Sequence, residues 1–308
     1  MAITLFSHSS CSLHSAGDHH PERPARLSEI NDQLIRSGME FIIQQRDASP
    51  ASKEDLYRVH DKQLVDSLFN LAPSSGYVQI DPDTHINRHS INAALHAAGA
   101  AINAVDTVMA STNQQAFCAI RPPGHHATRS QAMGFCLFNN IAVAAAYAIE
   151  KYGLTRVAIV DFDVHHGNGT EDIFQHDPRV LLCSSYQAQL YPYPKPQQNS
   201  DLPQSCIKIA LPAGCRSATW QQELHQQLLP ALDAFAPELI LISAGFDGHA
   251  EDEISQLLLT EADFAWLTAE IKTLAAKHCD GRIVSTLEGG YALSALGRSV
   301  VAHLKAML

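Results

Sequence analysis

The sequence predicts an α/β protein in which a mostly parallel sheet carries helices on both faces. Short, wholly apolar segments such as residues 157–160 are typical of strands buried on both sides, and they alternate with longer segments of helical periodicity. This alternation indicates βα units joined by right-handed crossovers. No linker, repeat or low-complexity tract interrupts the 308 residues, so we expect a single domain over residues 1–308.

The individual elements follow from apolar spacing and from capping residues. Ser52, followed by Glu54 and Asp55, is typical of a helix N-terminus, and residues 81–84 are typical of a turn. The expected strands cover residues 2–6, 116–120, 157–160, 180–184, 239–243 and 283–287, and a further short apolar segment covers 207–211. The expected helices cover residues 25–37, 90–110, 139–151, 170–176, 219–235, 260–278 and 292–307.

Charge and cysteine content narrow the class of protein. A formal net charge of −11 argues against a nucleic-acid-binding protein, because phosphate contacts require a basic surface. The seven cysteines are scattered without CxxC spacing, which favours reduced thiols in a reducing compartment. The first residues are too short an apolar run for a signal peptide, and no stretch is long enough to span a membrane. We therefore expect a cytoplasmic enzyme without nucleic-acid or membrane partners.

Four expected strands end in the same way, with a glycine-containing turn that carries reactive side chains. These segments are 116–126, 157–169, 239–247 and 283–291. In open parallel sheets, ligands bind outside the carboxyl ends of the strands, so the four turns are expected to converge on one pocket.

The turn after residues 157–160 predicts a metal site. Asp161, Asp163 and His165 are spaced by two, so a continuing strand would point all three side chains to one side. Two carboxylates and an imidazole repel and desolvate one another unless a cation is bound, and these donors suit zinc or manganese. Asp247 would add a second carboxylate beside Asp163 and His165, leaving a coordination position open. The alternative is a polar strand end that runs into a loop.

The other two turns carry groups suited to hydrolysis. His125 and His126 follow a rigid Pro-Pro-Gly turn and would supply an acid and a base. Tyr291, behind two glycines, offers a hydroxyl to a developing oxyanion. Together with a metal, these groups indicate hydrolysis of an amide or ester, although the histidines also fit a polar loop and the tyrosine a core edge.

A cluster of histidines near the N-terminus has a different explanation. His8, His14, His19 and His20 lie within a short stretch, but their spacing fits no helical or zinc-finger ligand pattern. We expect a polar loop here rather than a metal site.

Five motifs, in order, resemble the zinc-dependent histone deacetylase family. They are Arg-Pro-Pro-Gly-His-His-Ala (121–127), Gly-Phe-Cys-Leu-Phe-Asn-Asn (134–140), Asp-Phe-Asp-Val-His-His-Gly-Asn-Gly-Thr (161–170), Gly-Phe-Asp-Gly-His (245–249) and Glu-Gly-Gly-Tyr (288–291). The chain is more similar to the class II branch and its bacterial amidohydrolase relatives than to class I. The resemblance extends from His20 to the last helix, and it implies the fold shared with arginases: one α/β domain around an eight-stranded, mostly parallel sheet.

The resemblance also implies roles for individual residues. One Zn²⁺ per chain would be held by Asp163, His165 and Asp247. The acid and base would be His125 and His126, with His126 as general base and acid. Asp161 would orient His125, and Tyr291 would polarise the acyl carbonyl. Asn168 stands where class I enzymes have an aspartate, and an amide adds no negative charge, so the pKa of His126 is expected to be lower than in an aspartate-bearing relative.

The resemblance implies a substrate channel and potassium sites as well. Gly134, Phe135 and Tyr191 would line a narrow channel for an acyl-lysine stem, Asp81 would anchor substrate amides at the rim, and Arg26 would belong to the acetate-exit pocket. The inner K⁺ site would involve Asp161, Asp163, His165 and Ser184, and the outer one Phe174, Asp177 and Val180. The loop at 191–196, rich in tyrosine and proline, is expected to shape the rim.

Other functions stay open at this point. An arginase-type ureohydrolase needs a bridging aspartate two residues past His165, where this chain has Gly167. A non-catalytic acyl-lysine or polyamine-binding protein would not need the complete set of reactive groups. Acyl-lysine proteins, acetylpolyamines and small acylated metabolites all suit such a channel, and neither the substrate nor the oligomeric state follows from the sequence.

Overall fold

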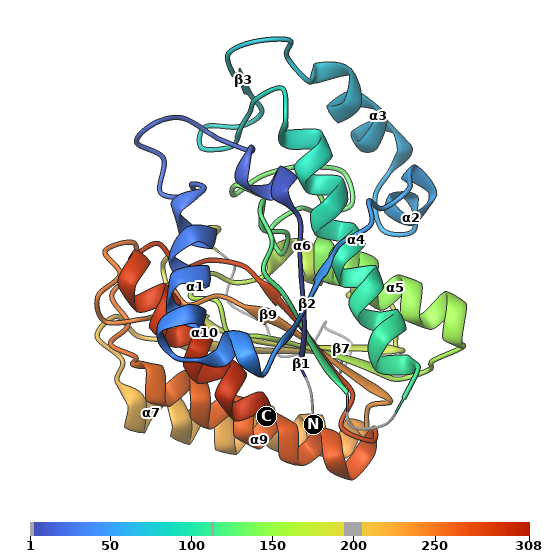
Figure 1. Ribbon diagram of the computed structural model, residues 1–308. Coiled ribbons are helices and arrows are strands. Elements are labelled where there is room, and N and C mark those ends of the chain that lie inside the picture. Colours follow the sequence, from blue (N-terminus) through green and yellow to red (C-terminus); the bar gives the residue numbers. More distant parts are fainter. Residues whose placement is uncertain (1–2, 112–113, 194–204) are drawn as a thin grey trace.

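An eight-stranded sheet forms the centre of the protein (Figure 1). The computed structural model describes residues 3–111, 114–193 and 205–308. The strand order is β2-β1-β5-β10-β9-β6-β7-β8, and all neighbouring strands are parallel. The strands are β1 (Ile3–Ser7), β2 (Gln44–Asp47), β5 (Gln115–Cys118), β6 (Val157–Asp161), β7 (Val180–Gln187), β8 (Cys206–Leu211), β9 (Leu239–Ala244) and β10 (Ile283–Leu287). A separate antiparallel pair consists of β3 (Val78–Gln79) and β4 (His85–Ile86).

Helices cover both faces of the sheet. In Figure 1, α4 and α5 lie on one side, whereas α1, α9 and α10 lie on the other. The longer helices are α1 (Ala25–Arg36), α3 (Lys62–Leu71), α4 (Ser90–Met109), α5 (Asn140–Tyr152), α9 (Glu261–His278) and α10 (Leu293–Met307). The shorter ones are α2 (Lys53–Tyr57), α6 (Asn168–Phe174), α7 (Ser217–Glu223) and α8 (Leu229–Phe235).

The central strands are apolar throughout because both of their faces are buried. In β6, Val157 and Ile159 belong to the core under α4 and α5, whereas Ala158 and Val160 belong to the core under α9 and α10. This division follows the two-residue period of a strand. The prediction of an α/β protein with a parallel sheet covered on both faces is confirmed.

The structure differs from the predicted elements in a few places. The edge strand β2 was not predicted, because its sequence, Gln-Gln-Arg-Asp, is exposed at all four positions and lacks apolar alternation. The helix α3 was also missed. The strand predicted at 180–184 continues to Gln187, and a π-helical segment, Leu224–Leu228, separates α7 from α8 within the helix predicted at 219–235. The N-cap at Ser52 is confirmed, with a full capping box to Asp55.

The strand order explains how distant motifs meet. The four turns singled out in the sequence follow β5, β10, β9 and β6, which are direct neighbours in the sheet. The pairing register brings Asp161 beside Ser243 and Leu287 beside Ala244, so these strands end at a similar level.

Within the described part of the chain, no helix has the length and apolar character needed to cross a membrane.

Candidate active site

The four turns are tied together by hydrogen bonds from the backbone of one turn to a carboxylate of another. The Gly289 N–H donates to Asp163 Oδ2 at 2.8 Å, and the Val164 N–H donates to Asp247 Oδ1 at 3.0 Å. The Gly124 N–H donates to Glu288 Oε2 at 2.7 Å. Asp163, Asp247 and Glu288 therefore each hold a neighbouring turn in place.

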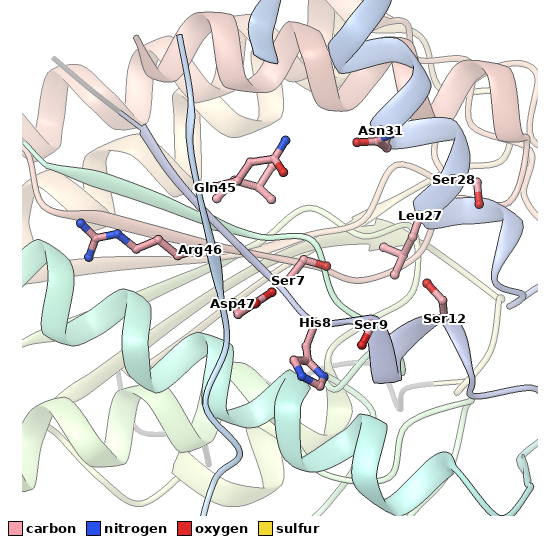
Figure 2. Close-up of a pocket in the computed structure, with 11 residues that line it drawn as sticks. Ser7, His8, Ser9, Ser12, Leu27, Ser28, Asn31, Gln45, Arg46 and Asp47 are labelled. Atoms are coloured by element: carbon pink, nitrogen blue, oxygen red, sulfur yellow. The ribbon is translucent and has the colours of Figure 1, made fainter. Parts of the chain in front are cut away.

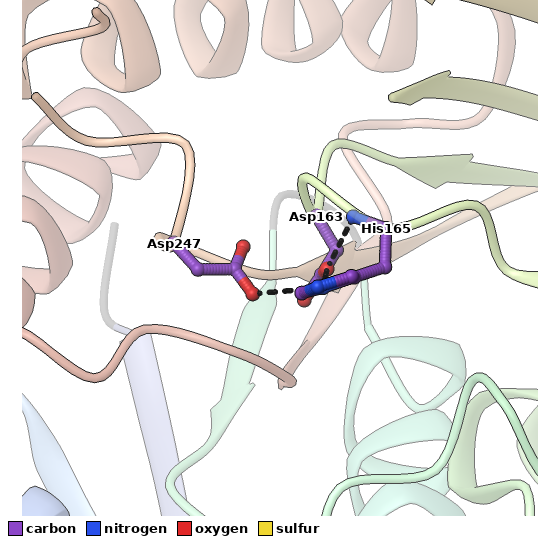
Figure 3. A group of neighbouring side chains, drawn as sticks. All are labelled: Asp163, His165 and Asp247. Carbon is purple, nitrogen blue, oxygen red and sulfur yellow. Dashed lines mark hydrogen bonds and ion pairs between the residues drawn. The ribbon is translucent and has the colours of Figure 1, made fainter. Parts of the chain in front are cut away.

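Asp163, His165 and Asp247 form one buried group, the metal-site cluster (Figure 3). The Nδ1 atom of His165 lies 3.0 Å from Asp163 Oδ1 and 3.2 Å from Asp247 Oδ2. Their candidate ligand atoms all lie within 4.8 Å of one another. A metal held by three protein ligands keeps a coordination position open for water or substrate.

The way in which these residues meet corrects the sequence interpretation. The strand does not continue past Asp161, and residues 162–166 form an irregular turn before α6 begins at Asn168. Asp163 and His165 are therefore brought together by the turn and not by strand alternation. Asp161 does not point to the same side as these two residues but toward His125, the partner that the resemblance implies for it.

The three side chains of the metal-site cluster shift one another's pKa values. Burial disfavours the imidazolium of His165, but the hydrogen bond to Asp163 and the Asp247 carboxylate outweigh burial and raise its pKa to about 10. Burial and the neighbouring Asp163 raise the pKa of Asp247 to about 6. Asp247 Oδ2 is buried and accepts no hydrogen bond from the described residues, and its only charged neighbour among them within 4.0 Å is the His165 ring, at 3.2 Å. A divalent cation would satisfy this oxygen and replace the proton on His165.

Two glycines leave the space that the metal-site cluster occupies. A Cβ atom on Gly245 would lie 2.0 Å from Asp163 Oδ2, and one on Gly289 would lie 2.1 Å from Asp247 Oδ2. Any other residue at either position would displace a carboxylate. The cluster thus fits a bound metal in its donor set, its orphaned oxygen and its space.

The tandem histidines lie beside this cluster and have different partners. His125 Nδ1 lies 2.9 Å from Asp161 Oδ2, and His126 Nδ1 lies 2.7 Å from Asn168 Oδ1. Burial opposes a charge on His125, but Asp161 and Asp163 raise its pKa to about 10. Burial, reinforced by His125 and His165, holds the pKa of His126 well below its usual range. One imidazole is therefore suited to carry charge and the other to stay neutral.

Glu288 is a buried residue of the site that the sequence analysis left without a role. Its Oε2 atom accepts hydrogen bonds from the N–H groups of Gly124 and His125, so it fixes the histidine turn. Burial raises its pKa to about 7. Its place in the Glu-Gly-Gly-Tyr motif was the available signal.

A cavity of about 300 Å³ opens onto the histidines and the tyrosine. Gly134 and Phe135 form one wall with left-handed backbone, φ +58° and +68°. The Tyr191 ring lies edge-on to His126, with centroids 5.0 Å apart. The residues that line the cavity are Asp83, Pro123, His125, His126, Gly134, Phe135, His165, Leu190, Tyr191, Tyr193, Ile254, Gly289 and Tyr291. The cavity is thus mainly aromatic and aliphatic, with reactive groups at one end.

Two aspartates lie in the turn where the rim carboxylate is predicted. Asp81 does not line the cavity: its Oδ1 atom accepts from the N–H groups of Asp83 and Thr84, and its Oδ2 atom faces the Gly134 N–H. Asp83, two residues further on, lines the cavity instead, and burial together with Asp81 raises its pKa to about 6. The role predicted for Asp81 stays a prediction, and Asp83 is the carboxylate of this turn that faces the cavity.

Arg26 lies behind Tyr291, outside the cavity lining. Its guanidinium carbon is 4.9 Å from the centroid of the Tyr291 ring, and its Nε–H donates to Gly290 O at 2.7 Å. Glu22 pairs with both Arg26 and Arg121, and all three side chains are fully buried. We call these three residues the arginine cluster.

Comparisons with known proteins agree with this geometry. The family model described as "Histone deacetylase domain" matches residues 20–307. The chain belongs to the histone deacetylase family. It is 38% identical over 299 residues to a "Probable deacetylase" of Archaeoglobus fulgidus, an alignment that covers 95% of this chain and 82% of the relative.

A second relative and a solved structure extend the comparison. The chain is 36% identical to "Polyamine deacetylase HDAC10" of Mus musculus, covering 93% of this chain and 45% of that protein. It spans only 20% of the length of "Type-2 histone deacetylase 2" of Dictyostelium discoideum. The fold matches the crystal structure of the HDA15 HD domain with a TM-score of 0.92 and 31% identity, covering 99% of this chain and 88% of that one. The deacetylase-family fold predicted from the sequence is confirmed.

A larger cleft lies away from the deacetylase-type site (Figure 2). It has a volume of about 470 Å³ and lies between β1, α1 and β2. Serines, His8, Asn31, Arg46 and Asp47 are among the residues that line it, and no group of three metal-ligating side chains occurs there among the described residues. Although this cleft is larger than the cavity at His125 and His126, its size alone does not indicate a reactive site.

Among the described residues, no group of three metal-ligating side chains includes the N-terminal histidines, and two of these histidines pack into the structure rather than lying in a solvated polar loop. His14 is buried, with Nδ1 2.7 Å from Ser90 Oγ and Nε2 3.4 Å from Glu22 Oε2. His20 packs edge-on against Phe135 at 4.5 Å between centroids. These two histidines support the arginine cluster and the cavity wall.

Proposed function

We propose that the protein is a zinc-dependent hydrolase that removes an acetyl or related acyl group from an amide such as acetyl-lysine. The observation that carries this proposal is the buried metal-site cluster, in which Asp247 Oδ2 accepts no hydrogen bond and His165 lines a largely apolar cavity. A family that acts on acetylated amines supplies the reaction class.

Asp163, His165 and Asp247 would hold the zinc ion. When bound, zinc lowers the pKa of a coordinated water and polarises a carbonyl oxygen. The two carboxylates and one imidazole leave a coordination position for substrate and water. An arginase-type pair of manganese ions lacks a ligand here, because Gly167 stands at the position of the bridging aspartate.

His126 is the residue we assign to proton transfer. Its depressed pKa keeps the imidazole neutral, so it accepts a proton from the attacking water and later delivers it to the leaving amine. Asn168 Oδ1 accepts from Nδ1–H and thereby leaves Nε2 as the basic atom. Asp161 accepts a hydrogen bond from Nδ1–H of His125 and favours its imidazolium, which would place positive charge near the developing oxyanion.

Tyr291 supplies the hydrogen bond to the acyl oxygen. Burial keeps the pKa of its hydroxyl well above its usual range, so the group remains protonated and able to donate. Arg26 holds the turn from behind through Gly290 O, and its position beside Tyr291 supports the predicted exit route for acetate.

The cavity walls favour a slender apolar stem. Gly134, Phe135 and Tyr191 would enclose the methylenes of an acyl-lysine, and Asp83 would accept N–H groups from the substrate backbone at the rim. The same carboxylate would bind an ammonium group, so an acylated polyamine is the second candidate, and a relative named as a polyamine deacetylase supports it.

Further features of the prediction rest on the resemblance. Asn168 supports assignment to the class II branch. Ser184 pairs with Asp161 in the β6–β7 register, which supports an inner potassium site, while an outer site at Phe174, Asp177 and Val180 rests on the motif alone.

All seven cysteines are buried and unbridged, which supports a reducing compartment such as the cytoplasm. We also infer one domain over residues 1–308. The rim loop at 191–196 lies partly outside the described residues.

Hydrolysis of a fluorogenic acetyl-lysine peptide by the zinc-loaded protein tests the proposal. Tyr291→Phe should lower kcat by about 10²- to 10³-fold, as expected for loss of an oxyanion donor. Tyr77→Phe, at a half-exposed tyrosine outside the cavity lining, is the matched control and should leave turnover unchanged. Equal turnover of the wild type and Tyr291→Phe would contradict the assigned role.

Two further measurements separate the alternatives. Metal analysis should give one zinc per chain, whereas two manganese ions would indicate a ureohydrolase. Comparing acetyl-lysine peptides, longer acyl-lysines and N-acetylputrescine by kcat/KM identifies the substrate class. Binding of acyl-lysine without turnover of any substrate would indicate a non-catalytic binding protein.

A further inference from the structure

Asp252 is a buried carboxylate that connects the turn after β9 with the turn that carries Tyr291. Its side chain is 6% exposed. Its Oδ2 atom accepts from the N–H groups of Tyr291 at 2.6 Å and Ala292 at 3.0 Å. Its Oδ1 atom accepts from the Ile254 N–H at 3.2 Å. Main-chain donors thus satisfy both oxygens, and no ion pair to Asp252 occurs among the described residues.

The contact replaces a missing helix cap. The helix α10 begins at Leu293, and its N-cap residue, Ala292, has no side-chain acceptor. Exposed N–H groups and the helix dipole favour an anion at this end. Asp252 supplies that anion from another part of the chain.

The Tyr291 turn is held from the other side by a cation. Arg26 donates from Nε to Gly290 O at 2.7 Å and from a terminal nitrogen to Glu288 O at 2.5 Å. Carbonyl oxygens of the turn therefore bind a guanidinium, while its N–H groups bind a carboxylate. Gly290 adopts φ +118°, so the backbone between these two holds is a conformation that other residues rarely adopt.

The loop that contains Asp252 also fixes a metal-site residue. Asp252 N donates to His249 O at 2.9 Å, and Ser255 Oγ donates to Asp247 O at 2.7 Å. The same short loop thus forms hydrogen bonds with Asp247 and with the backbone of Tyr291. We propose that Asp252 is a positioning residue that sets where the Tyr291 hydroxyl lies relative to the metal-site cluster. This inference rests on the proposed function for its effect on catalysis, but the contact itself does not.

A double-mutant cycle tests the catalytic consequence. In zinc-loaded protein, Asp252→Ala should lower kcat by about 10²-fold, the effect of misplacing a catalytic group by roughly 1 Å, with little change in KM. Asp252→Asn keeps one acceptor oxygen, and we expect partial rescue. In a Tyr291→Phe background neither substitution should lower kcat much further, because no hydroxyl remains to be misplaced. An equal loss in both backgrounds would show a general structural role and overturn the proposal.

Amide hydrogen exchange tests the contact without requiring activity. Exchange at Tyr291 and Ala292 should be faster in Asp252→Asn and Asp252→Ala, and unchanged in Glu253→Gln, which alters the exposed neighbouring carboxylate. Asn keeps the side-chain shape, so it decides the result if the alanine variant does not fold. Unchanged exchange would overturn the proposal. If exchange is faster in the Asp252 variants but the wild-type protein is inactive on every acylated amine, the proposed function is rejected and the contact stands.

Discussion

The metal-site cluster and the arginine cluster are both buried, but their charges are balanced in different ways. In the arginine cluster, Glu22 faces Arg26 and Arg121, and Arg121 also donates to the carbonyl oxygens of Cys11 and His14. Burial opposes ionisation of Glu22, but Arg121 and His14 hold its pKa well below its usual range. The metal-site cluster has two carboxylates, a single imidazole and an orphaned oxygen on Asp247.

This difference separates a structural ion cluster from a ligand site. A buried charge must be paired and hydrogen-bonded, and the arginine cluster meets that requirement with its own side chains and backbone. The metal-site cluster has two carboxylates for one imidazole, so its own side chains balance the charge only in part and an added cation would complete the pairing. Both clusters contact the Tyr291 turn, so damage to each should affect activity by a different route.

Removing a ligand from the metal-site cluster should have the largest effect. Asp247→Ala should abolish zinc retention and lower kcat/KM by at least about 10³-fold, because metal catalysis contributes several kcal/mol to transition-state stabilisation. Metal analysis and peptide hydrolysis measure the two losses. The exposed Glu253→Gln is the control, and a variant that keeps stoichiometric zinc and activity would contradict the ligand assignment.

Breaking the arginine cluster should act on stability. Glu22→Gln leaves two buried guanidinium groups without their carboxylate, so the free energy of unfolding should fall by about 3–5 kcal/mol. Urea denaturation measures the change, with Glu29→Gln as the control at a pair whose Arg36 partner is largely exposed. Zinc content should not change in the folded fraction. Normal stability with zinc lost would reverse the roles given to the two clusters.

Two buried histidines differ from both clusters, because they are neutral at pH 7. Protonation at low pH would give each of them a buried charge without a partner. Burial lowers the pKa of His303 to about 3 and that of His60 to about 4. The unfolded chain takes up these protons near pH 6.5 and the folded chain does not, so stability is full above that pH. It should fall by about 1.4 kcal/mol per pH unit for each histidine as the pH drops toward the folded pKa. Denaturant unfolding from pH 7 to 5 should show a shallower slope in His303→Gln than in the exposed-site control His176→Gln.

The smallest effect is expected from a substitution that places a carboxylate beside His126. Asn168→Asp should raise the pKa of His126, because its new charge favours the imidazolium. The acidic limb of the kcat/KM profile should then move to higher pH, while activity at alkaline pH stays within about tenfold of the wild type. An unmoved acidic limb would show that His126 does not control it.

Much of the site was predictable because its residues follow strands with a strong local signal. The apolar segment ending at Val160 and the polar residues after it indicated both the strand and the metal donors. The position of Asp83 was not predictable, since it depends on how one turn packs against the Gly134 wall. Asp252 gave no signal, because its partners are backbone N–H groups distant in sequence.

The sequence by itself determined the fold class, the buried strands and the identity of the groups that end them. Local burial and hydrogen-bonding preferences are written into short apolar and polar runs, so these features need no knowledge of distant contacts. Only the tertiary structure decided that β5, β10, β9 and β6 are neighbours, that a turn rather than strand alternation brings Asp163 to His165, and that Asp247 Oδ2 accepts no hydrogen bond. Those outcomes depend on long-range packing, in which the same carboxylate is a cap, an orienting partner or a metal ligand according to what lies beside it.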